Sequence, residues 1–374
     1  MIDATDWIVF ALVVLARFII PLFIPFFPLP AIIAALLLDG VDQTIFQVFT
    51  NLPLDGYQSY DKALDIYYLT VAYISTFRNW TNLFAFRVSR FLYYYRLVGV
   101  VLFETTQLRA LLLVFPNTFE YFFIWYEAVK LWWNPRKLSR TAVISAAAFI
   151  WIVIKLPQEY WIHIAQNDVT DTIKGILGGT PEDAWGPLIM NNIVLIVAVL
   201  VALVLLAVLV YRLLRRNVPP AEHKLGLRAD DNNPHPSADE IGRARRALYS
   251  RIFDVDLLEK IVLVGFIVYI FANILPTASA GLNLMLYVAV LVTATTAISH
   301  VLGRRGTTVA SGIVHALIVF GVNIVLTWAL AFLTRATPNL VNVLVFQSLL
   351  AVIVTLFDRY QLFYEARFPR GAAA

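Results

Sequence analysis

The sequence contains no cysteine among its 374 residues. This absence excludes disulfides, thiolate catalysis and cysteine-ligated metal centres. Charged residues are also scarce, at 14% of the chain against about 25% in a soluble domain. Because 60% of the residues are hydrophobic, a chain of this length has too little polar surface to stay in water. The composition predicts an all-α integral membrane protein, since the apolar runs are much longer than a transmembrane β-strand.

Several catalytic signatures are missing as well. The sequence has no glycine-rich nucleotide loop, no serine nucleophile elbow and no zinc-protease helix. We therefore expect neither an ATP-driven pump in this chain nor a cofactor, and no nucleic-acid partner. A homo-oligomer or a partner in a membrane complex stays open.

Long apolar runs dominate what is present. A membrane-crossing helix needs about 20 mostly apolar residues, and the sequence predicts about ten such helices. Six runs are nearly free of charge and lie at 7–27, 187–212, 258–276, 282–302, 308–334 and 340–360. Four more carry charged residues and lie at 60–78, 83–104, 110–133 and 141–162.

The segment after the first span is unusual. Prolines recur up to Pro30, and the apolar stretch 31–38 that follows is too short to cross a bilayer. We expect a short re-entrant or interfacial helix that ends at Asp39 and Asp42. The negative C-terminal end of such a helix would attract a cation.

The distribution of charge predicts the orientation of the chain. Lys and Arg concentrate in 134–140 and 212–260, whereas Asp and Glu dominate 27–58 and 163–186. Basic loops stay in the cytoplasm, so ten crossings put both termini there. Asp3 and Asp6 precede the first apolar run, which argues against a cleavable signal peptide. The compact loops are typical of a bacterial inner membrane, and we expect a multi-pass protein of the cell membrane.

Composition divides the chain into sections of different character. The first is rich in charge and aromatic residues, the second is an acidic external loop, the third is the sixth span, the fourth is a basic cytoplasmic linker, and the last is an apolar four-span module with a cytoplasmic tail. Their boundaries are 1–165, 166–186, 187–212, 213–256 and 257–374.

The basic linker contains one predicted helix. Ser237 and Glu240 form a capping-box pattern, and apolar residues follow at helical spacing. This pattern predicts a cytoplasmic amphipathic helix between spans six and seven, lying on the membrane surface. Its cations would bind anionic lipid, or would simply anchor the topology. They are Arg243, Arg245, Arg246 and Arg251.

Ionisable residues inside the first five spans form the candidate functional network. Such groups are expensive at bilayer depth and are usually paired and turned inward. The network consists of Arg17, Asp61, Asp65, Arg87, Arg90, Arg96, Glu120, Glu127 and Lys155.

Two features of this network, an arginine stripe and a carboxylate near mid-span, suggest a function. Arg87, Arg90 and Arg96 follow a spacing of three, with Tyr93 filling the gap, and such a stripe is typical of a voltage sensor, although a static set of ion pairs gives the same pattern. Glu120 follows Pro116 near the middle of its span, where a proton or cation site could form. We expect Arg96 to be the partner of Glu120.

Asp39 and Asp42 allow a second interpretation. They occupy the first external loop, and this position resembles that of the acidic residue in membrane glycosyltransferases that use lipid-linked sugars. The resemblance implies a base at Asp39 or Asp42 that acts at the outer face. A helix end followed by a polar turn would also explain these residues.

A third cluster follows the fifth span. Glu159 and His163 lie four residues apart, a spacing that metal ligands often share, and Asp168 follows. Neighbouring Tyr160 and Trp161 are equally typical of an interfacial belt.

The sequence therefore favours a transporter or channel-like protein that moves protons, ions or small polar solutes through its first half. An integral membrane enzyme that acts on a lipid-linked substrate is the alternative, as is a non-catalytic subunit of a membrane complex. Whether the chain has any enzymatic activity stays open.

Overall fold

The computed structural model describes most of the chain as helices. The described residues are 3–52, 57–167, 169–217, 220–231, 236–248, 255–274, 288, 290–298, 309–335, 337 and 339–369. Within them no strand occurs, and the predicted all-α class is confirmed for this part of the chain.

Six helical stretches in these ranges are long and apolar enough to cross a membrane. They are Ala4–Phe23, Pro28–Phe49, Arg140–Ile164, Ile193–Leu213, Gly312–Leu333 and Leu340–Arg367. Five of them overlap predicted spans, which supports a membrane protein. The second, at Pro28–Phe49, was not predicted as a span.

The predicted short re-entrant helix is wrong. Helix α1 (Ala4–Ile19) ends in a 3₁₀ turn, η1 (Ile20–Phe23), and α2 (Pro28–Phe49) then continues unbroken for 22 residues. Pro28 stands in the first turn of α2, where the missing amide hydrogen has no helical partner to lose. The prolines therefore begin a full-length helix instead of interrupting one.

Three other predicted spans also form long helices. These are α3 (Tyr57–Asn79), α4 (Leu83–Thr106) and α13 (Val255–Ile274), which are 23, 24 and 20 residues long. The predicted span at 110–133 is divided into α5 (Ala110–Val114) and α6 (Thr118–Lys130). Pro116 lies between the two helices, because proline cannot continue a helical hydrogen-bond ladder. The predicted span at 282–302 falls largely outside the described residues.

The remaining helices complete the bundle. A continuous rod consists of α7 (Arg140–Phe149), the π-helical turn η4 (Ile150–Lys155), α8 (Leu156–Glu159) and a second π-helical turn, η5 (Tyr160–Ile164). Short helices α9 (Val169–Ile176) and α10 (Trp185–Asn191) lead into α11 (Ile193–Asn217). The others are η3 (Pro135–Lys137), α12 (Ala238–Leu248), α15 (Val309–Thr334) and α16 (Leu340–Arg367).

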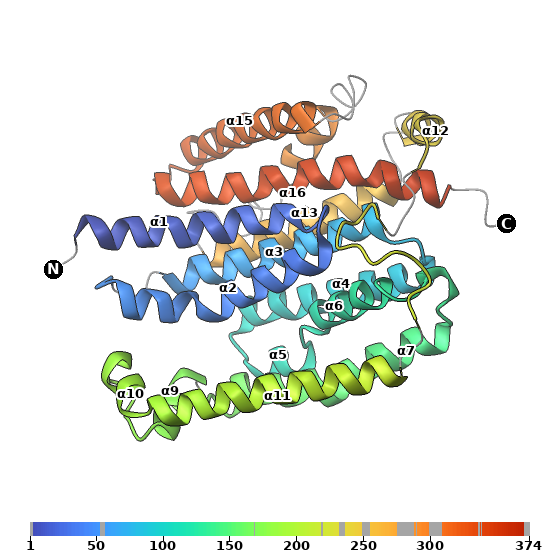
Figure 1. Cartoon of the computed structure of the whole chain (residues 1–374). Coiled ribbons are helices and arrows are strands. Elements are labelled where there is room, and N and C mark those ends of the chain that lie inside the picture. Colours follow the sequence, from blue (N-terminus) through green and yellow to red (C-terminus); the bar gives the residue numbers. More distant parts are fainter. Residues whose placement is uncertain are drawn as a thin grey trace.

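The long helices run roughly side by side, so the bundle has two ends (Figure 1). At one end lie the start of α1 and helices α9 and α10, which we call the acidic end because the loops rich in Asp and Glu are there. At the other lie the start of α7, helix α12 and the end of α16, which we call the basic end. Since α2 adds a pass between the two ends, the first and last described helices begin and finish at opposite ends (Figure 1).

Helix α3 lies at the centre of the buried core and packs against α16, α13, α4 and α2. Tyr73 of α3 stacks on Tyr93 of α4, with ring centroids 4.3 Å apart. Phe119 of α6 meets the Tyr93 ring edge-on at 5.4 Å and contacts Phe123 at 6.1 Å. We call these four side chains the aromatic layer, and all four are buried. Its rings join α3, α4 and α6 within the first-half bundle.

At the basic end, residues 220–231 lie across the ends of several first-half helices. We call this segment the strap; it follows α11 and belongs to the predicted linker (Figure 1). Its attachments are Glu222 N to Trp132 O (2.8 Å), His223 Nε2 to Lys130 O (2.8 Å), Ala229 N to Phe26 O (2.9 Å) and the ion pair of Asp230 with Arg78 (2.8 Å).

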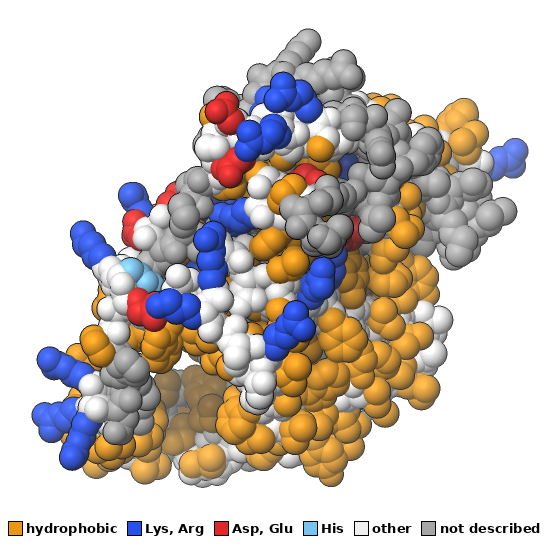
Figure 2. All heavy atoms as spheres, turned by 90° about the vertical axis from the view of Figure 1, so that its right-hand side faces the viewer, with side chains coloured by type: hydrophobic (Ala, Val, Ile, Leu, Met, Phe, Trp, Pro, Cys, Tyr) orange, Lys and Arg blue, Asp and Glu red, His pale blue; other side chains and the backbone are white. Residues whose placement is uncertain are grey.

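The Glu222 carboxylate fastens the strap to the turn before α7. It accepts hydrogen bonds from the Lys137 ammonium and the Asn134 amide, each at 3.1 Å. These two bonds, the Lys137 contact first, lower the pKa of the Glu222 carboxyl below its ordinary range. Figure 2 views the basic end directly and shows Lys and Arg side chains gathered there, with hydrophobic side chains beside them.

The predicted helix in the linker is present as α12. Ser237 and Glu240 form the expected capping box, with the Ser237 amide donating to the Glu240 carboxylate at 2.7 Å. Helix α12 packs against α16. Arg243 and Arg246 are exposed and Arg245 is half-buried, whereas Arg251 lies outside the described residues.

Candidate functional site

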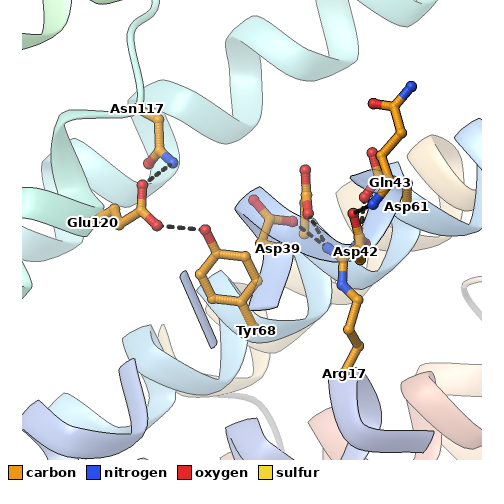
Figure 3. A network of polar contacts seen from close by, with 9 residues as sticks. Arg17, Asp39, Asp42, Gln43, Asp61, Tyr68, Asn117 and Glu120 are labelled. Carbon is orange, nitrogen blue, oxygen red and sulfur yellow. Dashed lines mark hydrogen bonds and ion pairs between the residues drawn. The ribbon is translucent and has the colours of Figure 1, made fainter. Parts of the chain in front are cut away.

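One arginine and four aspartates meet near the acidic end of the first-half bundle (Figure 3). Arg17, in the last turn of α1, pairs with Asp39 and Asp42 of α2 and with Asp61 and Asp65 of α3. We call these five residues the Arg17 cluster. Asp39 and Asp42 lie three residues apart and Asp61 and Asp65 four apart, so each pair faces the same way from its helix.

The side chains of the Arg17 cluster differ in their exposure, from buried to partly exposed. The side chains of Arg17 and Asp42 are each only 3% exposed, while those of Asp61 and Asp65 are each 38% exposed. Asp39 is intermediate, at 25%. The guanidinium is therefore the enclosed centre, and three of the carboxylates form a partly accessible rim.

The cluster carries more negative than positive charge. Oxygen atoms of Asp39, Asp61 and Asp65 all lie within 4.8 Å of one another. At that distance two ionised carboxylates repel by about 3.5 kcal/mol at an effective dielectric constant of about 20. A single guanidinium cannot balance four ionised aspartates, so the site favours uptake of a proton or a cation. Carboxylate oxygens of this kind also suit a hard divalent ion.

A cavity of about 300 Å³ adjoins this cluster. Asp39 and Asp65 line one part of it, and Glu120 and Lys155 line another. Helices α2, α3, α4, α6 and the α7–η5 rod all contribute to its wall. On α3 and α4, Tyr73 and Tyr93 of the aromatic layer lie about one helical turn from the nearest cavity-lining residues, toward the basic end. The cavity is thus on the acidic side of that layer.

Glu120 is buried in this wall and has three partners. It accepts hydrogen bonds from the Tyr68 hydroxyl and from the Asn117 amide (3.1 Å), and it lies 3.6 Å from the Lys155 ammonium. Tyr68 lies between Glu120 and the Arg17 cluster, with its hydroxyl pointing toward Glu120 (Figure 3). The Tyr68 side chain therefore lies between the carboxylate of α6 and the carboxylates of α2 and α3.

The predicted pairing of Glu120 with Arg96 is wrong. Arg96 donates to the backbone oxygen of Phe115 at 3.0 Å and lies 3.9 Å from Glu159. The break between α5 and α6 exposes that carbonyl to the arginine, while Lys155 occupies the place beside Glu120. Both acids and both cations nevertheless line the same cavity.

Glu159 and His163 also line this cavity, and they contact each other. His163 Nε2 lies 3.0 Å from Glu159 Oε2, and the other oxygen of Glu159 accepts the Asn117 backbone amide at 3.0 Å. The third predicted member of this group, Asp168, lies outside the described residues. Lys155 ends one π-helical turn and His163 lies within the next, and such turns often occur at functional sites.

Three predicted network residues lie elsewhere. Arg87 is exposed. Arg90 pairs with Glu259 of α13 at 3.1 Å, and Tyr73 donates to the same carboxylate. Glu127 accepts from Trp80 (2.7 Å) and pairs with Lys130 (2.9 Å) on the basic side of the aromatic layer.

Sequence reasoning missed Tyr68, Asn117 and Glu104, all of which line the cavity. A tyrosine in an aromatic-rich run and an asparagine after a proline give no distinct signal. Glu104 is different, because it closes a charged span and forms an ion pair with Lys62 at 3.6 Å. A search for charged residues at both ends of each charged span could have found Glu104.

Comparison with models of known families, with curated proteins and with solved structures gave no match to this chain.

Proposed function

We propose that the protein moves a proton or a small solute carrying positive charge across the membrane, through the polar network of its first half. One observation carries the proposal: a single cavity is lined both by Asp39 and Asp65 of the Arg17 cluster and by the buried Glu120–Lys155 pair. Buried ionisable groups inside a membrane bundle are usual on transport pathways.

The electrostatics support a positively charged species. The Arg17 cluster has one cation for four carboxylates, and three of these carboxylates are partly accessible. A cation or a proton that enters would relieve their mutual repulsion. The solute would then lie near Glu120, which lines the same cavity and accepts a hydrogen bond from Tyr68.

The structures on the basic side of the cavity support a mechanism of alternating access. The aromatic layer and then the strap lie between the cavity and the basic end. A transporter binds its solute near the middle of the membrane and opens to one side at a time. We interpret the arrangement as open toward the acidic end and closed toward the basic end.

We further propose the orientation of the bundle. Basic loops stay in the cytoplasm, so the basic end would face inward and the acidic end outward. Because α2 is a full-length helix, the N-terminus would then be outside and the C-terminus in the cytoplasm. A bacterial inner membrane stays our proposed location.

Flux measurements on the purified protein in liposomes test the proposal. We expect proton or cation flux that falls at least tenfold in the Glu120→Gln and Asp65→Asn variants, because each loses a carboxylate of the cavity. Glu182→Gln is the matched control, since Glu182 is an exposed acid at the acidic end. Unchanged flux in Glu120→Gln would refute the proposed pathway.

An enzyme at the outer face is the second candidate. Asp39 and Asp65 line the cavity, and together with Asp61 they could hold a divalent ion. Asp39 is then the better candidate base, because Asp42 is enclosed against Arg17. Turnover of a lipid-linked sugar that stops in Asp39→Asn, with no flux in the wild type, would favour this candidate.

A further inference from the structure

Lys155 is a buried cation whose hydrogen bonds are incomplete. The residue is only 3% exposed and lines the cavity. Its ammonium lies 3.6 Å from Glu120, which is an ion-pair distance but too long for a hydrogen bond. Its other neighbour is the face of the Tyr121 ring, 4.1 Å away. An ammonium has three donors, and within the described residues Glu120, at 3.6 Å, is the one acidic group that the structure places beside it.

One carboxylate at ion-pair distance leaves donors of this ammonium directed at the cavity, so this geometry points to a ligand. A group with negatively charged oxygens in the cavity would complete the donors of Lys155. The same wall offers further donors, because Arg96 and His163 also line the cavity. Arg96 uses one nitrogen on the Phe115 carbonyl and keeps a guanidinium that is 17% exposed at its side chain.

Other lining residues of the cavity have the reverse charge. Asp39 and Asp65 belong to the Arg17 cluster, whose negative charge is in excess. Apolar side chains, among them Leu36 and Val100, also line the cavity. A ligand in this space would meet the carboxylates of Asp39 and Asp65 and also the Lys155 ammonium.

We propose that the transported solute is a small zwitterion, with its oxyanion at Lys155 and its cationic group at Asp39 and Asp65. This inference rests on the proposed transport function and names its substrate class. A volume of about 300 Å³ is at the small end of ligand pockets, which limits the solute to a few heavy atoms beyond its charged groups.

Equilibrium binding to the full chain in nanodiscs tests the inference without any gradient. The probes are the unbranched ω-amino carboxylates from glycine to 6-aminohexanoate, each with its matched amine and its matched carboxylate. For at least one chain length, we expect the zwitterion to bind at least tenfold more tightly than either analogue. Equal affinity for the zwitterion and its amine would overturn the inference, as would no binding by any member of the series.

Two substitutions assign the ends of the solute. In Lys155→Met we expect the zwitterion to lose about ten- to one-hundredfold in affinity, the usual effect of removing a charge-assisted hydrogen bond, and the amine to be unaffected. In Asp65→Asn we expect the zwitterion and the amine to weaken together. Because the ratio of two affinities is taken within one variant, a loss of folded protein cannot imitate the result. Lys155→Arg, which keeps the charge, should recover part of the zwitterion preference.

The outcomes separate this inference from the proposed function. Zwitterion binding that depends on Lys155, without flux in liposomes, would support the site and refute transport. Proton or cation flux that depends on Glu120, with no preference for the zwitterion over its amine, would support transport and refute the zwitterion.

Discussion

Replacing Arg17 by glutamine removes the only cation that the cluster offers its four aspartates. The guanidinium contacts all four carboxylates, and Asp42 is enclosed with it at 3% side-chain exposure. Without that charge, the carboxylates must repel one another, take up protons or bind a cation. The folded state of the variant is therefore destabilised wherever the carboxylates remain ionised.

The magnitude follows from the geometry. Breaking a buried ion pair by removing one partner costs about 3–5 kcal/mol. Asp61 and Asp65 are each 38% exposed, so water screens part of their repulsion. We expect a loss in the free energy of unfolding near the lower limit, about 3 kcal/mol at neutral pH. As the pH falls from neutral into the acidic range, protons neutralise the carboxylates, and the loss should shrink.

Thermal unfolding of the two proteins in nanodiscs, followed across this pH range, measures the effect. Arg87→Gln is the matched control, because Arg87 is an exposed arginine of α4 and its loss should change little. A divalent cation added at neutral pH should also recover part of the stability of Arg17→Gln. Equal midpoints for Arg17→Gln and wild type, or a loss that does not depend on pH, would refute the reasoning.

Two further predictions concern the cavity wall and the strap. Gly99→Ala should destabilise the protein by about 1–3 kcal/mol in the same unfolding assay, because the new methyl group would overlap Cβ of Phe115, whose carbonyl binds Arg96. Gly40→Ala is its control: nothing lies within 4 Å of the added carbon, so the change should be neutral or stabilising, and a loss equal to that of Gly99→Ala would contradict the steric argument. The strap should detach in acid, because the folded protein lowers the pKa of the Glu222 carboxyl. The ionised carboxylate therefore stabilises the attached strap at a pH above the ordinary pKa of glutamate, and this stabilisation is lost as the pH falls through the lowered pKa. Spin labels can be placed on cysteines introduced at Lys224 and Arg136, because the chain has no native cysteine. We expect the distance between the labels to become longer or broader in acid, and to be independent of pH in the Glu222→Gln variant. A distance that is constant with pH when Glu222 is present would contradict the predicted detachment.

The amino-acid sequence was sufficient for the class of fold and for the choice of the first half as the polar part. Scarce charge and long apolar runs follow directly from the needs of a lipid solvent, so composition alone identifies a membrane helix bundle. The capping box at Ser237 and Glu240 was equally readable, because it depends only on residues three apart. Arg17, Asp61, Asp65, Glu120 and Lys155 were singled out because ionisable groups are rare at such depth.

The partners of these residues could not be read in the same way. Glu120 pairs with Lys155 instead of Arg96, because the break at Pro116 turns a carbonyl toward the arginine and the π-helical turns rotate the lysine inward. Pairing across helices depends on rotation about each axis, which the order of residues does not specify. The prolines before α2 misled for a local reason, since proline in the first turn starts a helix as readily as proline elsewhere ends one.

The strap has a consequence for how the protein is made. Domains form in order as the chain leaves the ribosome, and α1 to α6 are synthesised before residues 220–231 exist. Until then the strap cannot bind Trp132, Lys130 and Phe26. The early helices must therefore insert while their basic ends are still uncovered. A nascent chain halted before residue 220 should therefore be a substrate for membrane proteases, whereas one halted just after the strap has reached the membrane should be protected.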